Sequence, residues 1–324
     1  MRSNVFPPTT RFGMILNSVM TEPIAYLNAE YIPNSQCVLP IYDAGIVIGA
    51  AVTDLLRTFR GRPFAVKEHV RRFFESARYA YIDLGMSETE MLAIVERLIT
   101  HNVAAWDGRE VALVFYATAG QFPVYAGAAG MAGDLRTTVC LHCFPLPLQL
   151  WKRAIAEGVH VVTPAQRHIH PATLNSKIKH RNRLHMWIGD QQAKLADPKA
   201  IGLYLDHDGN ITETGGANFL IFKDGTIISP CRNNILWGVT LETVRRLSGP
   251  LGLQFAERDL QIHDVVNADE AWLCTTPYFL TAVVKINGIP IASGRPGATW
   301  GRLMSAFSAE VGVDVARQVL DAAD

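Results

Sequence analysis

The chain has 324 residues, of which 49% are hydrophobic and 19% are charged. This composition describes a globular protein long enough for two ordinary domains, and it excludes disorder on a large scale. Because 30 basic residues balance 30 acidic ones, no overall electrostatic field attracts nucleic acid or an anionic membrane. We therefore expect neither of them as a partner.

The amino-terminal segment and the cysteines indicate a cytoplasmic protein. Residues 1–23 contain paired prolines and scattered polar residues instead of an apolar signal core or membrane span, so we expect an N-terminal extension. The five cysteines are an odd number and lie mostly in apolar runs, as reduced core thiols do. Cys140 and Cys143 have C-x-x-C spacing, but in a strand residues three apart face opposite sides. We therefore expect no metal site.

Residues 24–65 predict an antiparallel meander. Short apolar runs alternate with turns, one of the runs covers residues 37–45, and Arg60-Gly61 has the composition of a tight hairpin turn. A first helix follows, in which apolar residues recur at helical spacing after His69.

A second helix begins after Ser87, with Glu90 at the spacing of a capping box. Strand-like runs at 110–120 and 135–144 then complete a small domain, which we assign to residues 24–143. Two prolines mark residues 144–150 as an inter-domain linker.

Residues 151–324 predict a second and larger unit that mixes strands and helices, with hairpin turns at 206–210 and 223–225. Its other predicted elements are a strand at 158–164, a basic stretch at 175–183 leading into a helix that ends near 195, a strand at 211–222, a helix beginning near 240, strands at 270–277 and 279–288, and a helix from about 297.

The basic stretch carries Lys177, Lys179, Arg181 and Arg183 where a helix begins. Helix N-termini carry partial positive charge, so basic residues are unfavourable there unless a bound anion compensates their charge or the function requires them. Three interpretations stay open: a solvated basic face, a nucleic-acid-binding patch, or a lysine whose pKa neighbouring cations lower, which makes its amine nucleophilic.

Two further passages contain groups that a ligand could use. The predicted strand at 211–222 holds Glu213 and Asn218 on either side of a glycine pair, which indicates a bulge or the close approach of a ligand. Gly238 precedes a helix that begins near Thr240, where free N–H groups and the hydroxyl form an anion site or an ordinary N-cap. Thr275 and Thr276 end a strand as simple β-formers or as hydroxyl donors.

In their order, these passages resemble the class IV (fold-type IV) aminotransferases, a family that includes branched-chain and D-amino acid aminotransferases, (R)-amine transaminases and aminodeoxychorismate lyase. The likeness runs from about Ile24 to Gly294. It implies an α+β fold of two domains, a smaller N-terminal α/β domain and a larger C-terminal mixed β domain with helices. It also implies pyridoxal 5′-phosphate (PLP) as cofactor and a homodimer.

The resemblance also implies roles for individual residues. Lys179 matches the Schiff-base lysine, with Lys177 as its nearest rival, and Glu213 matches the glutamate that pairs with the pyridine nitrogen. Arg72, in the pattern His69-x-x-Arg72, matches an arginine of the phosphate site. The other implied cofactor-binding residues are Asn218, Leu236, Gly238, Val239, Thr240, Thr275 and Thr276.

The departures from the family pattern fall around the substrate. Thr53 stands where many members carry an aromatic residue, and Pro277 removes an N–H that could hold a carboxylate. Arg183 either contacts the cofactor hydroxyl, receives a substrate carboxylate or is a surface arginine. With Tyr278, these residues are our substrate-site candidates.

The expected function is PLP-dependent transamination between an amino acid or primary amine and a 2-oxo acid. Apolar residues near the predicted site, Trp237, Tyr278 and Phe279, favour hydrophobic amino donors. Two alternatives stay open. One is a PLP-dependent lyase of the aminodeoxychorismate lyase type, and the other is a non-catalytic protein that binds a partner through the basic residues 177–183.

Overall fold

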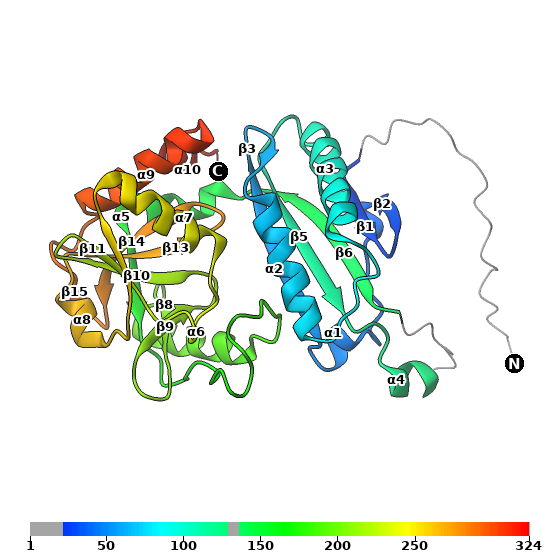
Figure 1. Ribbon diagram of the computed structural model, residues 1–324, viewed down its shortest axis with the longest axis horizontal. Coiled ribbons are helices and arrows are strands. Elements are labelled where there is room, and N and C mark those ends of the chain that lie inside the picture. Colours follow the sequence, from blue (N-terminus) through cyan, green and yellow to red (C-terminus); the bar gives the residue numbers. More distant parts are fainter. Residues whose placement is uncertain (1–21, 129–135, 324) are drawn as a thin grey trace, which may run out of the picture.

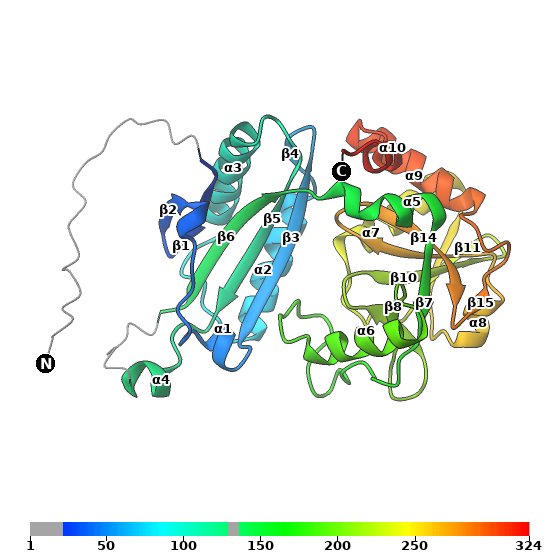
Figure 2. The same ribbon diagram turned by 180° about the vertical axis from the view of Figure 1, so that it is seen from behind.

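The computed structural model describes residues 22–128 and 136–323, so nearly all of the expected extension 1–23 lies outside the described residues. Two β-sheets lie side by side, each with its own helices (Figure 1). One sheet is built from residues 24–145 and the other from residues 159–290. Seen from behind, the chain passes from one to the other at a single connection (Figure 2). This mixture of sheets and helices confirms the predicted α+β class.

The first sheet has six strands, all antiparallel, in the order β2-β1-β6-β5-β3-β4. Its strands are β1 Ile24–Leu27, β2 Glu30–Pro33, β3 Ala51–Phe59, β4 Arg62–Pro63, β5 Val111–Thr118 and β6 Thr138–Pro145. The last strand runs through Pro145, two residues beyond the predicted domain limit at 143.

Helices α2 (Val66–Tyr79) and α3 (Glu88–Ala105) cover one face of this sheet (Figure 1). Alternate residues of the strands bury apolar side chains against them, and the rings of Phe73 and Phe115 lie 5.4 Å apart between centroids. The Ser87–Glu90 capping box is formed as predicted. Cys143 belongs to this core, whereas Cys140 lies 3.4 Å from Cys37, sulfur to sulfur. The two cysteines of the C-x-x-C therefore face opposite sides, as expected.

Two details of the first unit test the expected meander. Arg60 and Gly61 form the hairpin turn between β3 and β4, with positive φ angles of 53° and 70°. The run at 37–45 is not a strand, and this prediction was wrong. Asp43 accepts a hydrogen bond from the N–H of Gly45 at 2.7 Å and caps the short helix α1 (Ala44–Val47). The end of the run therefore begins a helix, whose first free N–H groups the carboxylate of Asp43 satisfies.

The second sheet closes on itself. Its order is β12-β11-β10-β13-β14-β7-β8-β9, β15 pairs with β14, and a further pairing joins β9 to β10. These strands are β7 Val159–Val162, β8 Ile201–Leu205, β9 Ile211–Thr214, β10 Asn218–Lys223, β11 Thr226–Ser229, β12 Gln254–Glu257, β13 Glu270–Thr275, β14 Phe279–Ile286 and β15 Ile289–Pro290. Glu213 and Asn218 are the register partners at the closure.

The predicted single strand at 211–222 is therefore two strands joined by a tight turn, which corrects the sequence interpretation. Gly215 and Gly216 lie in the turn, where the hydroxyl of Thr214 accepts a hydrogen bond from the N–H of Ala217 at 2.9 Å. The glycine pair reverses the chain and brings Glu213 back beside Asn218. The side-chain amide of Asn218 donates to the carboxylate of Glu213 at 3.0 Å.

Helices pack around this closed sheet. They are α5 Lys152–Glu157, α6 Leu184–Ala196, α7 Val239–Ser248, α8 Ile262–Val266, α9 Ala298–Val311 and α10 Val315–Leu320, while α4 Pro123–Ala128 belongs to the first unit. One apolar cluster fills the sheet's interior, and a second lies between the sheet and helices α7 and α9.

The segment before α6 crosses to the first sheet and docks on the free edge of β3. The N–H of Thr53 donates to the carbonyl of Lys179 at 2.8 Å, and the N–H of Arg181 donates to the carbonyl of Ala51 at 3.0 Å. Ile178 is buried in the core of the first sheet. Lys179 is therefore held in place by the small domain.

Arg57 forms another link between the two units. Its guanidinium is fully buried and donates to the carbonyl of Pro277 at 2.5 Å and to the side chain of Gln318 on α10 at 2.8 Å. We expect Arg57→Ala to lower the free energy of unfolding by about 2–4 kcal/mol, because it leaves buried acceptors unpaired and opens a cavity. Urea unfolding measures this. The exposed Arg62→Ala is the control, and an equal loss in both variants would contradict the assignment.

Candidate active site

A pocket opens between α2 and the point where the second sheet closes. Every residue that the resemblance assigned to the cofactor lines it, although these residues come from α2, the docked segment, β9, β10, the start of α7 and the end of β13. They are Arg72, Lys179, Glu213, Asn218, Leu236, Gly238, Val239, Thr240, Thr275 and Thr276. The fold therefore brings together groups that lie more than 200 residues apart in the chain.

Lys179 reaches the pocket with an amine that is otherwise enclosed by protein. Its pKa is lowered to about 7, chiefly by burial and also by the positive charges of Arg72 and Arg183, while Asp54 and Glu213 act in the opposite direction. An ordinary lysine is almost wholly protonated at neutral pH. The Lys179 amine is instead substantially neutral there, and so it is able to act as a nucleophile.

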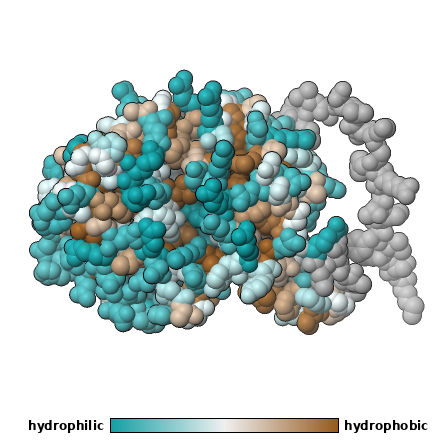
Figure 3. Space-filling view, viewed as in Figure 1, coloured by the Kyte–Doolittle hydropathy of each residue, from teal (hydrophilic) through white to brown (hydrophobic). Residues whose placement is uncertain are grey.

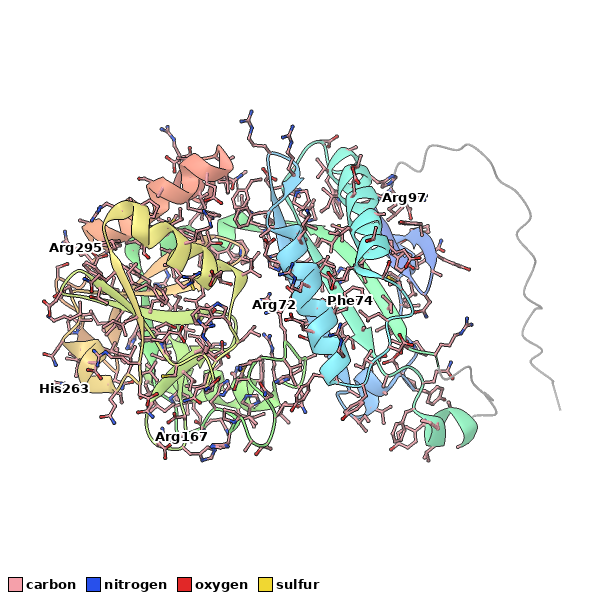
Figure 4. The ribbon with its side chains drawn as sticks, viewed as in Figure 1. Arg72, Phe74, Arg97, Arg167, His263 and Arg295 are labelled. Atoms are coloured by element: carbon pink, nitrogen blue, oxygen red, sulfur yellow. The ribbon has the colours of Figure 1, made fainter. Side chains whose placement is uncertain are left out.

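Arg72 extends from α2 toward the second sheet (Figure 4). Asp54 on β3 orients it by accepting two hydrogen bonds, from Nε at 2.8 Å and from Nη2 at 2.7 Å. His69 contacts the same carboxylate through Nδ1 at 2.8 Å. Burial by itself raises the pKa of Asp54, but the charges of Arg72 and His69 outweigh it and hold that pKa well below its usual range. The ionised carboxylate thus fixes a cation at the pocket wall.

Glu213 presents a carboxylate whose two oxygens have fixed partners. The amide of Asn218 donates to Oε2 at 3.0 Å, and the N–H of Leu236 donates to Oε1 at 3.2 Å. The amide of Asn218 also donates to the carbonyl of Leu236 at 2.7 Å, which ties the Leu236 loop to the closure of the sheet. A carboxylate held in this way has a defined direction into the pocket.

The start of α7 forms a second wall. Gly238 is its N-cap, and a Cβ at this position would collide with the side-chain oxygen of Asn218. The close approach therefore requires glycine. The N-terminal N–H groups of α7 and the hydroxyl of Thr240 lie at the pocket, and this geometry favours an anion. On the opposite side, the hydroxyl of Thr275 donates to the carbonyl of Gly216 at 2.9 Å.

The pocket also holds buried polar atoms without hydrogen-bond partners. They are Nε2 of His168, Oγ of Ser176, Nδ1 of His180 and Nε2 of His185. Unpaired buried polar groups are rare in folded proteins, and each is costly. Together with the cations and the α7 terminus, these atoms fit an anionic ligand that is rich in oxygen and nitrogen.

Of the four substrate-site candidates, only Arg183 lines the pocket. Its Nη1 donates to the carbonyl of Gly215 at 2.7 Å and its Nε to the carbonyl of His180 at 3.2 Å, so its side chain is anchored by backbone and is not a free surface arginine.

The other three candidates do not line this pocket, and their part in a substrate site stays a prediction. The hydroxyl of Thr53 donates to the carbonyl of Phe115 within its own sheet at 2.7 Å. Pro277 offers its carbonyl to Arg57. Tyr278 packs against Trp151, with ring centroids 5.3 Å apart.

The residues that favoured hydrophobic donors also lie elsewhere. The indole of Trp237 donates to Glu242 at 3.0 Å and lies under the guanidinium of Arg232. Phe279 stacks on Phe307 in the core beneath α9. Neither residue nor Tyr278 lines the pocket, so the sequence argument for a hydrophobic donor has no structural support.

Sequence reasoning missed several residues of this site. His168, Ser176 and His185 line the pocket, and Asp54 orients Arg72. The histidines lie within a few residues of the recognised basic stretch and could have been noted for that reason. Asp54 carries no local signal, because its contact with Arg72 depends on how β3 and α2 pack.

The family model described as amino-transferase class IV matches residues 51–286. The chain belongs to this family. The D-alanine aminotransferase of Bacillus licheniformis is 27% identical over 294 residues, which cover 90% of this chain and 98% of the relative. Branched-chain-amino-acid aminotransferase-like protein 1 of Arabidopsis thaliana is 27% identical over 292 residues, or 88% of this chain, and the match spans 50% of the plant protein.

Solved aminotransferases share the fold. A crystal structure of a branched-chain amino acid aminotransferase from T.th., solved with pyridoxamine 5′-phosphate, superposes with a TM-score of 0.78 at 20% identity, covering 90% of this chain and 95% of that one. The two-domain fold-type IV architecture is thereby confirmed. The site described above is the pocket of an aminotransferase. The protein is therefore an enzyme, and the alternative of a non-catalytic binding protein is wrong.

Half of the basic stretch of this aminotransferase is part of its pocket. Lys179 and Arg183 line the pocket, and the backbone around His180 bridges to Val52 of β3. Of the basic residues named there, Lys177 and Arg181 are exposed. Among the described residues, no helix is both long and apolar enough to cross a membrane.

Proposed function

We propose that this chain catalyses PLP-dependent transamination between an amino acid or primary amine and a 2-oxo acid. The cofactor is pyridoxal 5′-phosphate. The observation that carries the proposal is an amine of depressed pKa, that of Lys179, in one pocket with the oriented carboxylate of Glu213. The unpaired polar atoms of the same pocket fit a cofactor that carries a phosphate, a hydroxyl and a ring nitrogen.

The position of each residue in the pocket indicates its proposed role. When bound, the cofactor supplies an aldehyde and an electron-withdrawing ring. The amine of Lys179 would hold the aldehyde as an imine, with loss of water, and once released it would be placed to accept and return a substrate proton. The carboxylate of Glu213 would be the partner of the ring nitrogen and would favour its protonated form. Arg72, Thr240 and Thr276 hold the phosphate with the N–H groups of the α7 start, which keeps the ring from tilting.

Leu236, Val239 and Thr275 complete the cofactor's surroundings. Asn218 keeps Glu213 and the Leu236 loop in register through its two hydrogen bonds. Arg183 is our candidate for the substrate carboxylate or the cofactor hydroxyl, because its guanidinium is charged, anchored and at the pocket. Hydrophobic amino acids remain the first donors to test, since the relatives are named for alanine and branched-chain amino acids.

Half-reactions test the proposal directly. Purified protein with PLP is mixed with L-leucine, D-alanine or (R)-1-phenylethylamine, and the visible absorbance of the lysine-bound cofactor is followed. We expect at least one donor to abolish the band and a 2-oxo acid to restore it. Release of pyruvate from a single substrate without an acceptor would instead identify the lyase alternative, and no response to any amine would contradict both.

The pKa of Lys179 predicts how the cofactor-free protein takes up PLP at different pH values. Only the neutral amine attacks the aldehyde, so the association rate should rise roughly fivefold from about pH 6 to 7 and level off above about pH 8. Stopped-flow absorbance measures the rate. A rate that keeps rising through pH 9 would show an ordinary lysine and contradict the assignment.

We propose that the enzyme is a homodimer. Helix α6 exposes Leu184 and Trp187 at 67% and 62%, and α1 with its C-cap exposes Ile46 and Ile48. Both helices lie along the same edge of the molecule (Figure 1), and hydrophobic side chains gather at the α1 and α4 end of that edge (Figure 3). Exposed large apolar side chains that gather on one edge are typical of a protein–protein interface.

Replacing Trp187 tests the dimer. We expect Trp187→Glu to yield monomers at micromolar concentration, because the buried charge would have no partner at the interface. Light scattering after size exclusion measures the mass. Ile289→Glu, at the similarly exposed strand β15 on the far side of the second sheet, is the control and should leave the dimer intact. A dimeric Trp187→Glu protein would exclude α6 from the interface.

We also propose a cytoplasmic location. All five cysteines are free thiols, and Cys37 and Cys140 remain unbonded at 3.4 Å. Thiols so close together persist in a reducing compartment.

A further inference from the structure

His168 lies behind Glu213 and has no role in the family pattern described above. It follows β7, its N–H donates to the carbonyl of Leu205 on β8 at 2.9 Å, and only 7% of its surface is exposed. Its Nε2 lies 3.5 Å from Oε1 of Glu213, which is ion-pair distance but longer than a well-formed hydrogen bond.

The contact of Nδ1, the other ring nitrogen, indicates where the imidazole of His168 carries its hydrogen. Nδ1 lies 3.1 Å from the carbonyl oxygen of Ile169, which can only accept, so Nδ1 bears a hydrogen. In a neutral ring, Nε2 would then direct a lone pair at the carboxylate of Glu213, and the contact would be repulsive. In the imidazolium, Nε2 carries a hydrogen and the same contact is attractive.

The charged groups around His168 favour the imidazolium. Two carboxylates act on it, Glu213 on β9 and Asp206 in the turn after β8. The histidines nearby, His185 on α6 with its ring centroid 6.0 Å away and His180 in the docked segment, have pKa values lowered to about 4 and are neutral. Burial lowers the pKa of His168, but the adjacent carboxylate of Glu213 outweighs burial and raises it.

We propose that His168 is a positioning residue for Glu213: its imidazolium donates from Nε2 to Oε1, so that Oε2 is left to face the ring nitrogen of the cofactor. The pairing of His168 with Glu213 does not depend on the proposed function. Only the orientation of Oε2 toward the cofactor rests on it. The Nε2 contact and the N–H of Leu236 share one carboxylate oxygen, whereas the other oxygen has the Asn218 amide as its protein partner. The histidine therefore sets both the ionisation and the direction of Glu213.

The cofactor-free protein tests the pairing without any catalysis. Histidine-labelled protein is titrated by ¹⁵N NMR. An ordinary histidine is half protonated at about pH 6.5, and we expect Nε2 of His168 to be more than half protonated there. In the Glu213→Gln variant the protonated fraction of Nε2 at that pH should be smaller. A mostly unprotonated Nε2 at that pH, or a titration that Glu213→Gln leaves unchanged, overturns the proposal.

The loaded protein tests the effect on the cofactor site. We expect His168→Leu to weaken PLP binding roughly tenfold and to move the pH midpoint of the visible band upward, because a positive charge near the ring nitrogen is lost. His168→Gln keeps an N–H donor at similar reach and should recover most of the affinity. His263→Gln, an exposed histidine on α8 far from Arg72 (Figure 4), is the control.

The two experiments separate the possible failures. If the wild-type protein takes up no PLP, the proposed function fails, while the NMR titration still decides whether His168 pairs with Glu213. If PLP binds but His168→Leu matches the wild type in affinity and visible titration, the histidine does not position Glu213 and the inference is overturned.

Discussion

Lys179→Ala should lower kcat by at least about 10³-fold and remove the lysine-bound cofactor band. The variant loses both the amine that captures the aldehyde and the group that moves the substrate proton, and general acid–base catalysis alone contributes about 10²–10⁴-fold. Borohydride reduction followed by digestion and mass spectrometry provides a second measurement. The wild-type protein should carry the pyridoxyl group on the peptide that contains Lys179, and the variant should carry none.

Lys177→Ala is the matched control for this experiment. Lys177 lies two residues earlier, is exposed and does not line the pocket, so its loss removes the same side chain from the same segment without removing an amine from the pocket. We expect it to keep the cofactor band and the activity of the wild-type protein. A pyridoxyl group on Lys177, or a fully active Lys179→Ala variant, would falsify the assignment of the reactive amine.

Glu213→Gln should lower kcat about 100-fold while PLP stays bound. The amide is close in size to the carboxylate, but it carries no charge to keep the ring nitrogen protonated, so the ring withdraws electrons less well in the transition state. Arg72 and the start of α7 do not depend on Glu213, and cofactor binding should therefore persist. Steady-state kinetics and the visible spectrum of the same sample report the two effects separately.

Glu157→Gln provides the comparison for a lost carboxylate elsewhere. Glu157 ends α5, where it is exposed and 3.8 Å from Arg153, and an exposed pair of this kind contributes little. Its variant should behave as the wild type. If Glu213→Gln also kept full activity, the carboxylate would have no part in the chemistry, and the proposed arrangement of the ring would be wrong.

The order of short motifs along the chain was enough to predict the family, and it supplied a cofactor-binding set whose members the fold brings into one pocket. Lys179, Glu213 and the Gly238–Thr240 passage lie in segments whose residue types and local turns recur in class IV aminotransferases, and the match over 51–286 bears out the family. Periodicity also predicted α2, α3 and the Arg60-Gly61 turn, because each depends on neighbours within a few residues.

Strand boundaries near the site followed less well from local pattern. The run at 37–45 has strand composition, yet Asp43 caps a helix there. The run at 211–222 has the composition of one strand, yet its glycines form a turn. In both places one side-chain or backbone hydrogen bond decides the geometry, and an average over residue types does not contain it.

The sequence by itself determined the family and named candidate site residues, whereas the tertiary structure decided which of those residues meet. Thr53 and Tyr278 were candidates for the substrate site, but their side chains contact Phe115 and Trp151 outside the pocket. Asp54 contacts Arg72 and His168 contacts Glu213 only because the fold brings their elements together. The physical reason is the difference in sequence separation between the two kinds of interaction. Local propensity acts over a few residues, but the contacts that build this pocket join strands and helices distant in the chain and form only when two cores pack together.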